Sequence, residues 1–173
     1  MDLGTLVARS AQLEKRAMAF YRQLAGRFAA HPEAARLWRE MSNTEASHFA
    51  LLQLTEDWVA MAGGQAQETP VTPEALEALS DRLAALEAAA GRADCGLADA
   101  AELTVAWEEL ELPRVIELVG ELPGTARGRV LAGMIGEADE HFRILMDLVG
   151  AAGVVALADR VSALAERARA VLG

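Results

Sequence analysis

Cysteine, aromatic residues and β-type patterns are all scarce in this sequence of 173 residues. Its only cysteine is Cys95, so no internal disulfide can form and no Cys-x-x-Cys pair offers a thiolate site for iron or zinc. Aromatic residues make up 5% of the chain, and β-branched residues seldom alternate with polar ones, so strands are not expected. Ala and Leu dominate instead, which favours helix.

Basic side chains are outnumbered by acidic ones. The chain has 16 Lys and Arg against 26 Asp and Glu, a formal net charge of -10. Binding to nucleic acid depends on cationic side chains that neutralise phosphate, and docking to an anionic membrane surface needs the same charge. We therefore expect neither kind of partner.

Long apolar runs are missing as well. None approaches the roughly 20 residues that span a bilayer, and the charged residues Glu14, Lys15 and Arg16 come too early for the apolar core of a signal peptide. We expect a cytoplasmic protein without a membrane span. The length suits one domain with a substantial core.

Apolar residues recur every three or four positions along most of the chain, as they do in amphipathic helices. Proline and glycine separate these segments. The sequence predicts helices over about 3–30, 32–62, 73–90, 97–122, 125–149 and 157–171.

The connections between the four long segments differ in length. The first two are joined tightly, as are the last two, whereas residues 63–96 separate the pairs and contain a short helix of their own. This predicts an all-α fold over residues 1–150: a ferritin-like antiparallel four-helix bundle of two helical hairpins joined by a long crossover. Residues 151–173 are expected to form an amphipathic helix that packs on the bundle or on a partner subunit.

The two halves of the chain contain a repeat. Residues 41–52, MSNTEASHFALL, align without a gap on residues 134–145, MIGEADEHFRIL. The Met, the His, the Phe and the last two aliphatic positions coincide. Two of the three histidines of the chain, His48 and His141, therefore occupy equivalent places.

Several glutamates fall on apolar helix faces. Glu45 and His48 are three residues apart and share the apolar face of their helix. Glu14 lies on the inward stripe of the first helix, and Glu108 and Glu111 lie on that of the helix over 97–122. Buried carboxylates are costly without a partner, and a cation is one way to satisfy several together. Oxygen ligands with imidazole and no thiolate favour iron or manganese, with zinc possible.

One Glu from each of two helices and Glu-x-x-His from the others is the pattern of carboxylate-bridged two-metal sites. In these residues the chain resembles the di-iron domain of rubrerythrins, in the ferritin-like superfamily, over about residues 3–150 and without the rubredoxin module. The resemblance implies that one or two iron ions bind and that peroxide or oxygen reacts there. By fold analogy we also expect a homodimer. The implied ligands are Glu14, Glu45, His48, Glu108, Glu111 and His141, with Tyr21 as a hydrogen-bond donor to a ligating carboxylate.

One position departs from the pattern. The ungapped repeat calls for a glutamate at position 138, where the chain has Ala138; Glu137 lies four residues before His141 and is the tentative substitute. The sequence leaves open a distorted two-metal centre, a single-metal remnant or a vestige. It also leaves open that Glu45 and His48 are a hydrogen-bonded pair in the core. The corresponding functions are an iron-dependent peroxidase or ferroxidase, an iron-binding or storage module, and a metal-free helical interaction protein.

Overall fold

The fold is described by a computed structural model. It covers the backbone of residues 1–64, 66–122 and 124–172, and the side chains of these residues except 125–128, 131, 132, 134–139, 171 and 172. Within this part of the chain there are six α-helices, one short 3-10 helix (η1) and no strand, which confirms the predicted all-α class. The helices are α1 (Leu3–Arg27), α2 (Pro32–Met61), α3 (Pro73–Gly91), α4 (Leu97–Glu121), α5 (Gly124–Ala151), η1 (Val155–Leu157) and α6 (Ala158–Leu172).

The helix starts follow from local chemistry. Asp2 caps α1 by accepting a hydrogen bond from the backbone N–H of Thr5 at 2.8 Å, and Thr72 caps α3 by accepting one from Ala75 at 3.3 Å. Helices α2 and α3 both begin with proline, whose missing N–H is not needed in the first turn. After α2 the chain turns at Gly63, whose φ of 68° suits glycine.

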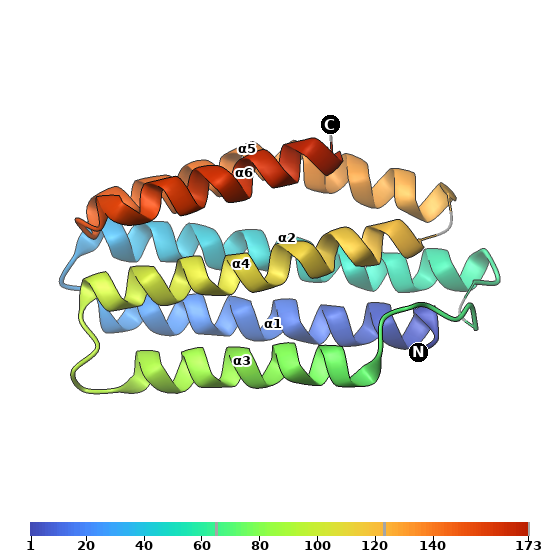
Figure 1. The fold of residues 1–173 in the computed structure, drawn as a ribbon, viewed down its shortest axis with the longest axis horizontal. Coiled ribbons are helices and arrows are strands. Elements are labelled where there is room, and N and C mark those ends of the chain that lie inside the picture. Colours follow the sequence, from blue (N-terminus) through green and yellow to red (C-terminus); the bar gives the residue numbers. More distant parts are fainter. Residues whose placement is uncertain (65, 123, 173) are drawn as a thin grey trace.

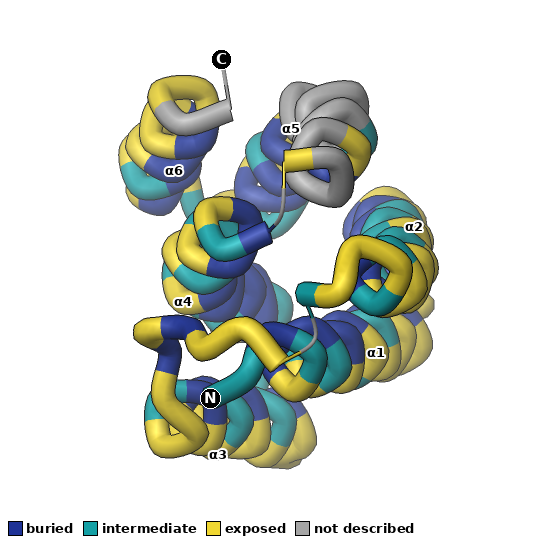
Figure 2. The backbone as a smooth tube through the Cα atoms, turned by 90° about the vertical axis from the view of Figure 1, so that its right-hand side faces the viewer, coloured by how far each residue is buried: buried dark blue, intermediate teal, exposed yellow. Residues whose placement is uncertain are grey.

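The six helices lie along a common long direction (Figure 1). Seen from the end, α1, α2, α4 and α5 surround a shared interior, with α2 between α1 and α5 (Figure 2). Helix α3 packs against α1 and α4 on one side, and α6 packs against α4 and α5 on the other. The buried residues of each described segment face the neighbouring helices.

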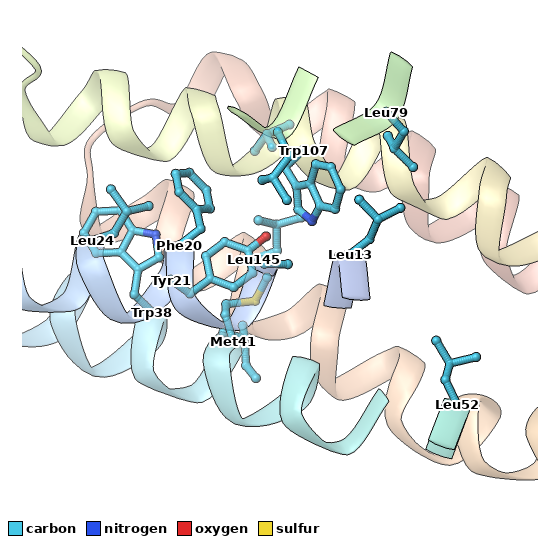
Figure 3. Packing of buried hydrophobic residues seen from close by; sticks show 14 of the residues in the cluster. Leu13, Phe20, Tyr21, Leu24, Trp38, Met41, Leu52, Leu79, Trp107 and Leu145 are labelled. Atoms are coloured by element: carbon cyan, nitrogen blue, oxygen red, sulfur yellow. The ribbon is translucent and has the colours of Figure 1, made fainter. Parts of the chain in front are cut away.

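Large aromatic side chains fill one part of the interior. Trp38, Trp107, Tyr21 and Phe20 are almost completely buried and lie among leucines of several helices (Figure 3). The indole N–H of Trp38 donates to the hydroxyl of Thr104 at 3.0 Å, which connects α2 to α4. Burying large side chains of this kind is the main force that holds such helices together.

The two outer helices are held mainly by apolar stripes. Leu76, Leu79 and Leu83 of α3 are buried against the core. Leu164 of α6 is fully buried in a smaller cluster with Phe142 of α5. The amphipathic patterns of both segments predicted such packing.

The beginning of the chain is tied to the segment that leads into α3. The backbone N–H of Leu3 donates to the carbonyl of Gln67 at 2.8 Å, and that of Thr69 donates to the carbonyl of Met1 at 2.9 Å. These bonds hold part of the long connection against the start of α1. Among the described residues, no helix combines the length and the apolar character needed to cross a membrane.

Candidate metal centre

The polar residues predicted for the site come from four different helices. Those with described side chains are all at least partly buried: Glu45 has no exposed surface, and the side chain of His48 is the most open at 18%. Glu14 is carried by α1, Glu45 and His48 by α2, Glu108 and Glu111 by α4, and His141 by α5.

The helix registers explain why these side chains point inward. Glu45 follows the buried Met41 by four residues and precedes the buried Leu52 by seven, so all three share one face of α2. Glu14 lies between Leu13 and Ala17, which are both buried on α1. The carboxyl groups therefore lie in the interior because they share a helix face with buried apolar residues.

One group of potential ligands joins α1 to α2. Single ligand atoms of Glu14, Glu45 and His48 all lie within 4.8 Å of one another. The Nδ1 of His48 is 3.2 Å from Oε2 of Glu45 and 3.8 Å from Oε2 of Glu14. An ion among these atoms would have two carboxylates and one imidazole as ligands.

A second group joins α2 to α4 and α5. Ligand atoms of Glu45, Glu108 and His141 also lie within 4.8 Å of one another, and Nε2 of His141 is 2.8 Å from Oε2 of Glu108. Glu45 thus belongs to both groups. The rings of His48 and His141 are nearly parallel, with centroids 6.0 Å apart. Glu45 is therefore the residue through which the two groups are connected.

Tyr21 contacts the second group. Its hydroxyl donates a 2.5 Å hydrogen bond to Oε1 of Glu108, and both side chains are buried. Burial, and then the negative charge of Glu108, raise the pKa of Tyr21 well above its usual value, so the phenol keeps its proton. The hydrogen bond to a potential ligand agrees with the role that the resemblance implied.

Three polar atoms of the two groups lack a hydrogen-bond partner. Within the described part of the chain, no hydrogen-bond partner is assigned to Oε2 of Glu14, Oε1 of Glu45 or Nδ1 of His141, although all three atoms are buried. Buried polar atoms are normally paired, so each such atom requires an explanation. All three are atom types that bind metals.

Burial and mutual repulsion raise the pKa values of some glutamates in the cluster. Burial raises the pKa of Glu45 to about 8, despite the nearby imidazole of His48. Burial also raises the pKa of Glu111 well above its ordinary value, and the charges of Glu14, Glu45 and Glu108 raise it further. Without a cation, Glu45 therefore keeps its proton near neutral pH, and the pKa of Glu111 is shifted in the same direction.

The pKa values of the two histidines and of Glu14 are shifted in the directions expected for ion pairs. Burial alone would lower the pKa of His48, but its contacts with Glu14 and Glu45 outweigh that effect and raise it well above 6.5. For His141 the same opposing effect of burial is overcome by the charge of Glu108, so its pKa is also raised. Burial works against ionisation of Glu14, yet the interaction with His48 lowers its pKa overall.

Two predicted ligands are not members of these compact groups in the described structure, although one of them, Glu111, interacts with Glu14 of the first group. Glu111 is buried on α4, but in the described structure it belongs to neither of the two compact groups. Glu137, the tentative substitute, lies outside the residues whose side chains are described. The two compact groups therefore consist of five of the residues predicted as ligands.

Comparison with known proteins adds no relative. No family model, no curated protein and no solved structure matches the chain. The resemblance to rubrerythrins stays a prediction from the sequence.

Some neighbours of the site were not predicted to have a role in it. Leu76 and Leu79 of α3 line a cavity that reaches Glu14 and Glu111. The leucine stripe of α3 indicates that these residues are buried, but the cavity is formed by several helices together. The indole N–H of Trp107, directly before Glu108, is also buried without a hydrogen-bond partner in the described structure.

Proposed function

We propose that this protein is an iron-binding protein of the di-iron carboxylate type, with a ferritin-like four-helix bundle as its scaffold. The observation that carries the proposal is the sharing of Glu45 between two histidine-capped carboxylate groups. Such a donor set, with oxygen ligands, imidazoles and no thiolate, suits iron or manganese better than copper. Zinc is a further candidate, because its geometric demands are weak.

The helix arrangement supports this scaffold. Helices α1 and α2 are consecutive and in close contact, α4 and α5 form the second pair, and α3 lies in the long connection between the pairs. Ferritin-like bundles have one long crossover between two helical hairpins and bind their metals with residues from facing helices. Here the candidate ligands come from the four helices of the two pairs.

The partnerless atoms favour a metal over a purely hydrogen-bonded core. If Glu45 and His48 were only a core pair, Oε1 of Glu45 would stay without a partner. A cation at each group would satisfy buried oxygens and replace protons on carboxyls such as Glu45, which otherwise stay protonated to about pH 8.

Each candidate ligand would have a distinct role in holding the ions. Glu14 and His48 would bind one ion, Glu108 and His141 the other, and Glu45 would bridge them. Tyr21 would hold Glu108 in its orientation by donating to the oxygen Oε1. When bound, two ferrous ions would supply two electrons, which with two protons reduce one hydrogen peroxide to two waters while the iron becomes ferric.

The position of Ala138 favours a second candidate function. In the repeat, this alanine replaces a carboxylate that would complete the second Glu-x-x-His motif. A centre with one bridging carboxylate fewer would bind iron more weakly or at one site only. The alternative is therefore an iron-binding or storage module with little turnover.

Activity of the iron-loaded protein separates the two candidates. We expect the ferrous protein to consume hydrogen peroxide faster than the same amount of free ferrous iron does. We expect Glu45→Gln to remove most of this gain. The matched control is Glu56→Gln, an exposed glutamate on the same helix, which should behave as the unchanged protein does. Iron binding without any gain in rate would leave storage as the function, and equal rates in the two variants would rule out chemistry at Glu45.

A further inference from the structure

A small cavity adjoins the candidate metal centre on the side of α3. Its walls come from five helices, α1 to α5, and most of its lining side chains are leucine or valine. Leu13 of α1 and Leu79 of α3 point toward each other there (Figure 3), and Val115 and Leu118 of α4 line it as well. We call this space the leucine chamber.

The leucine chamber ends at the potential metal ligands. Glu14, His48 and Glu111 belong to its lining, as do the polar residues Ser10 and Arg114. Glu14 and His48 belong to the compact group that joins α1 to α2. A molecule held in the chamber would therefore lie next to one of the two groups, because Glu14 and His48 are themselves part of the lining.

The size of the chamber limits what can enter. The space that a water-sized molecule can occupy there is about 30 Å³. Pockets for drug-sized ligands span roughly 300–1,000 Å³, and a single water needs about 10–15 Å³ measured in this way. The chamber therefore fits a molecule of two heavy atoms and excludes an organic substrate of ordinary size.

The polarity of the walls discriminates among molecules of that size. Water and hydrogen peroxide must give up hydrogen bonds when they pass between leucine and valine side chains, which costs free energy for each unpaired group. Dioxygen has no hydrogen bonds to lose. Apolar walls that lead to a polar end suit a small apolar molecule on its way to the carboxylates.

We propose that the leucine chamber is a binding site for dioxygen, which it delivers to the side of the candidate centre formed by Glu14 and His48. This inference rests on the proposed function for the delivery step, but the chamber can bind a gas whether or not metal is present. As an occupant of the chamber, dioxygen is favoured over hydrogen peroxide, because it has no hydrogen bonds to lose.

Xenon tests the chamber without any metal. Xenon is apolar and close to dioxygen in size, and methyl groups near a bound xenon atom shift in NMR spectra under xenon pressure. We expect saturable shifts at Leu13, Leu79 and Val115, and their loss in Val115→Phe, because the larger side chain fills the space. Val155→Phe, at a largely exposed position of η1, is the matched control and should keep the shifts. No saturable shift at these three residues in the unchanged protein would overturn the proposal.

Oxidation rates test delivery. With iron content first measured without oxygen and matched between samples, we expect Val115→Phe to slow oxidation of bound ferrous iron by dioxygen at least fivefold. Oxidation in Val155→Phe should be unchanged. In Leu79→Ala, which enlarges the chamber, it should be no slower than in the unchanged protein. Equal rates in Val115→Phe and Val155→Phe would overturn delivery through the chamber.

The two proposals fail in distinguishable ways. If the anaerobic protein bound no iron, the function proposed above would be wrong and so would delivery, yet the xenon shifts would still decide whether the chamber binds a gas. If iron bound normally and xenon did not enter, only the chamber proposal would be wrong.

Discussion

Among single residues, Glu45 has the most demanding environment. It is completely buried, it contacts His48, and one of its oxygens has no hydrogen-bond partner in the described structure. Its pKa of about 8 means that the folded protein holds a proton that the unfolded chain releases near its ordinary value of 4.5. Glu45 thus connects the stability of the metal-free protein to pH.

The metal-free protein should become less stable as the pH rises from about 5 to 8. Between these values the folded state binds more protons than the unfolded chain, because the pKa of Glu45 is raised on folding, and the free energy of unfolding then falls with pH. Each such proton contributes a slope of about 1.4 kcal/mol per pH unit. The raised pKa of His48 acts in the same direction above its ordinary value of 6.5. Urea unfolding at a series of pH values measures the slope.

Urea unfolding of Glu45→Gln over the same pH range shows how much of the slope comes from Glu45. Glutamine cannot ionise, so the slope should be clearly smaller in this variant, whereas Glu56→Gln should keep the original slope because Glu56 is exposed. A stability that rises steadily from pH 5 to 8 in the unchanged metal-free protein would contradict the description of the cluster.

Tyr21 offers a second test at this scale. Tyr21→Phe removes the 2.5 Å hydrogen bond to Glu108 and leaves a buried carboxylate oxygen without that donor. We expect the free energy of unfolding to fall by about 1–3 kcal/mol. We also expect iron affinity to fall about tenfold or more, since donors to ligating carboxylates orient them. Denaturant unfolding and anaerobic iron titration measure these effects, and an unchanged affinity would show that Tyr21 does not orient a ligand.

The grouping of residues was largely predictable from helix register, with clear limits. On α4, Glu108 faces inward, whereas its neighbour Glu109 forms a two-pronged ion pair with Arg160 at 2.7 and 2.9 Å. The apolar stripe distinguishes these two positions. That Oε1 of Glu45 lacks a partner was not predictable, because it depends on side-chain packing between helices.

At the scale of elements, α6 shows which kind of contact holds an outer helix. It carries the ion pair of Arg160 with Glu109, whose side chains are both about one-third exposed, and the fully buried Leu164. Its neighbours on α4 and α5 lie next to Glu108 and to His141. The position of α6 therefore bears on the second group of potential ligands.

Two substitutions on α6 should lower the free energy of unfolding by different amounts. We expect Leu164→Ala to lower the free energy of unfolding by about 2–5 kcal/mol, the range for leucines removed from a packed interior. Arg160→Gln should cost less than about 1 kcal/mol, because partly exposed ion pairs are screened by water. Thermal or urea unfolding of both variants gives the comparison. A larger loss in Arg160→Gln would mean that the ion pair, not apolar burial, holds α6.

Helix boundaries were predicted well where local signals set them. The starts at Pro32, Pro73 and Leu97 agree with the sequence, because proline and capping residues act within one turn. Proline does not mark a boundary at Pro113, because α4 continues through this residue to Glu121. The hydrogen bonds between the first residues and the segment before α3 were not predictable, because they join positions far apart in the sequence.

At the scale of the whole molecule, metal binding and folding should be coupled. An ion that binds only the folded state stabilises it by about 2.7 kcal/mol at a hundredfold excess over its dissociation constant. It should also displace protons from Glu45 and His48, so we expect affinity to increase from pH 6 to 8. Thermal unfolding with ferrous iron, with and without a chelator, measures the coupling. Equal melting temperatures in both conditions would contradict it.

The most direct test of the central claim is the iron content of the protein. Anaerobic titration with ferrous iron should give saturation at one or two equivalents, and Glu45→Gln should remove at least one of them. Glu56→Gln should leave the count unchanged. Two equivalents would indicate a complete centre and one a reduced centre. No bound iron, or the same count in Glu45→Gln as in the unchanged protein, would contradict the claim that the groups sharing Glu45 form a metal centre.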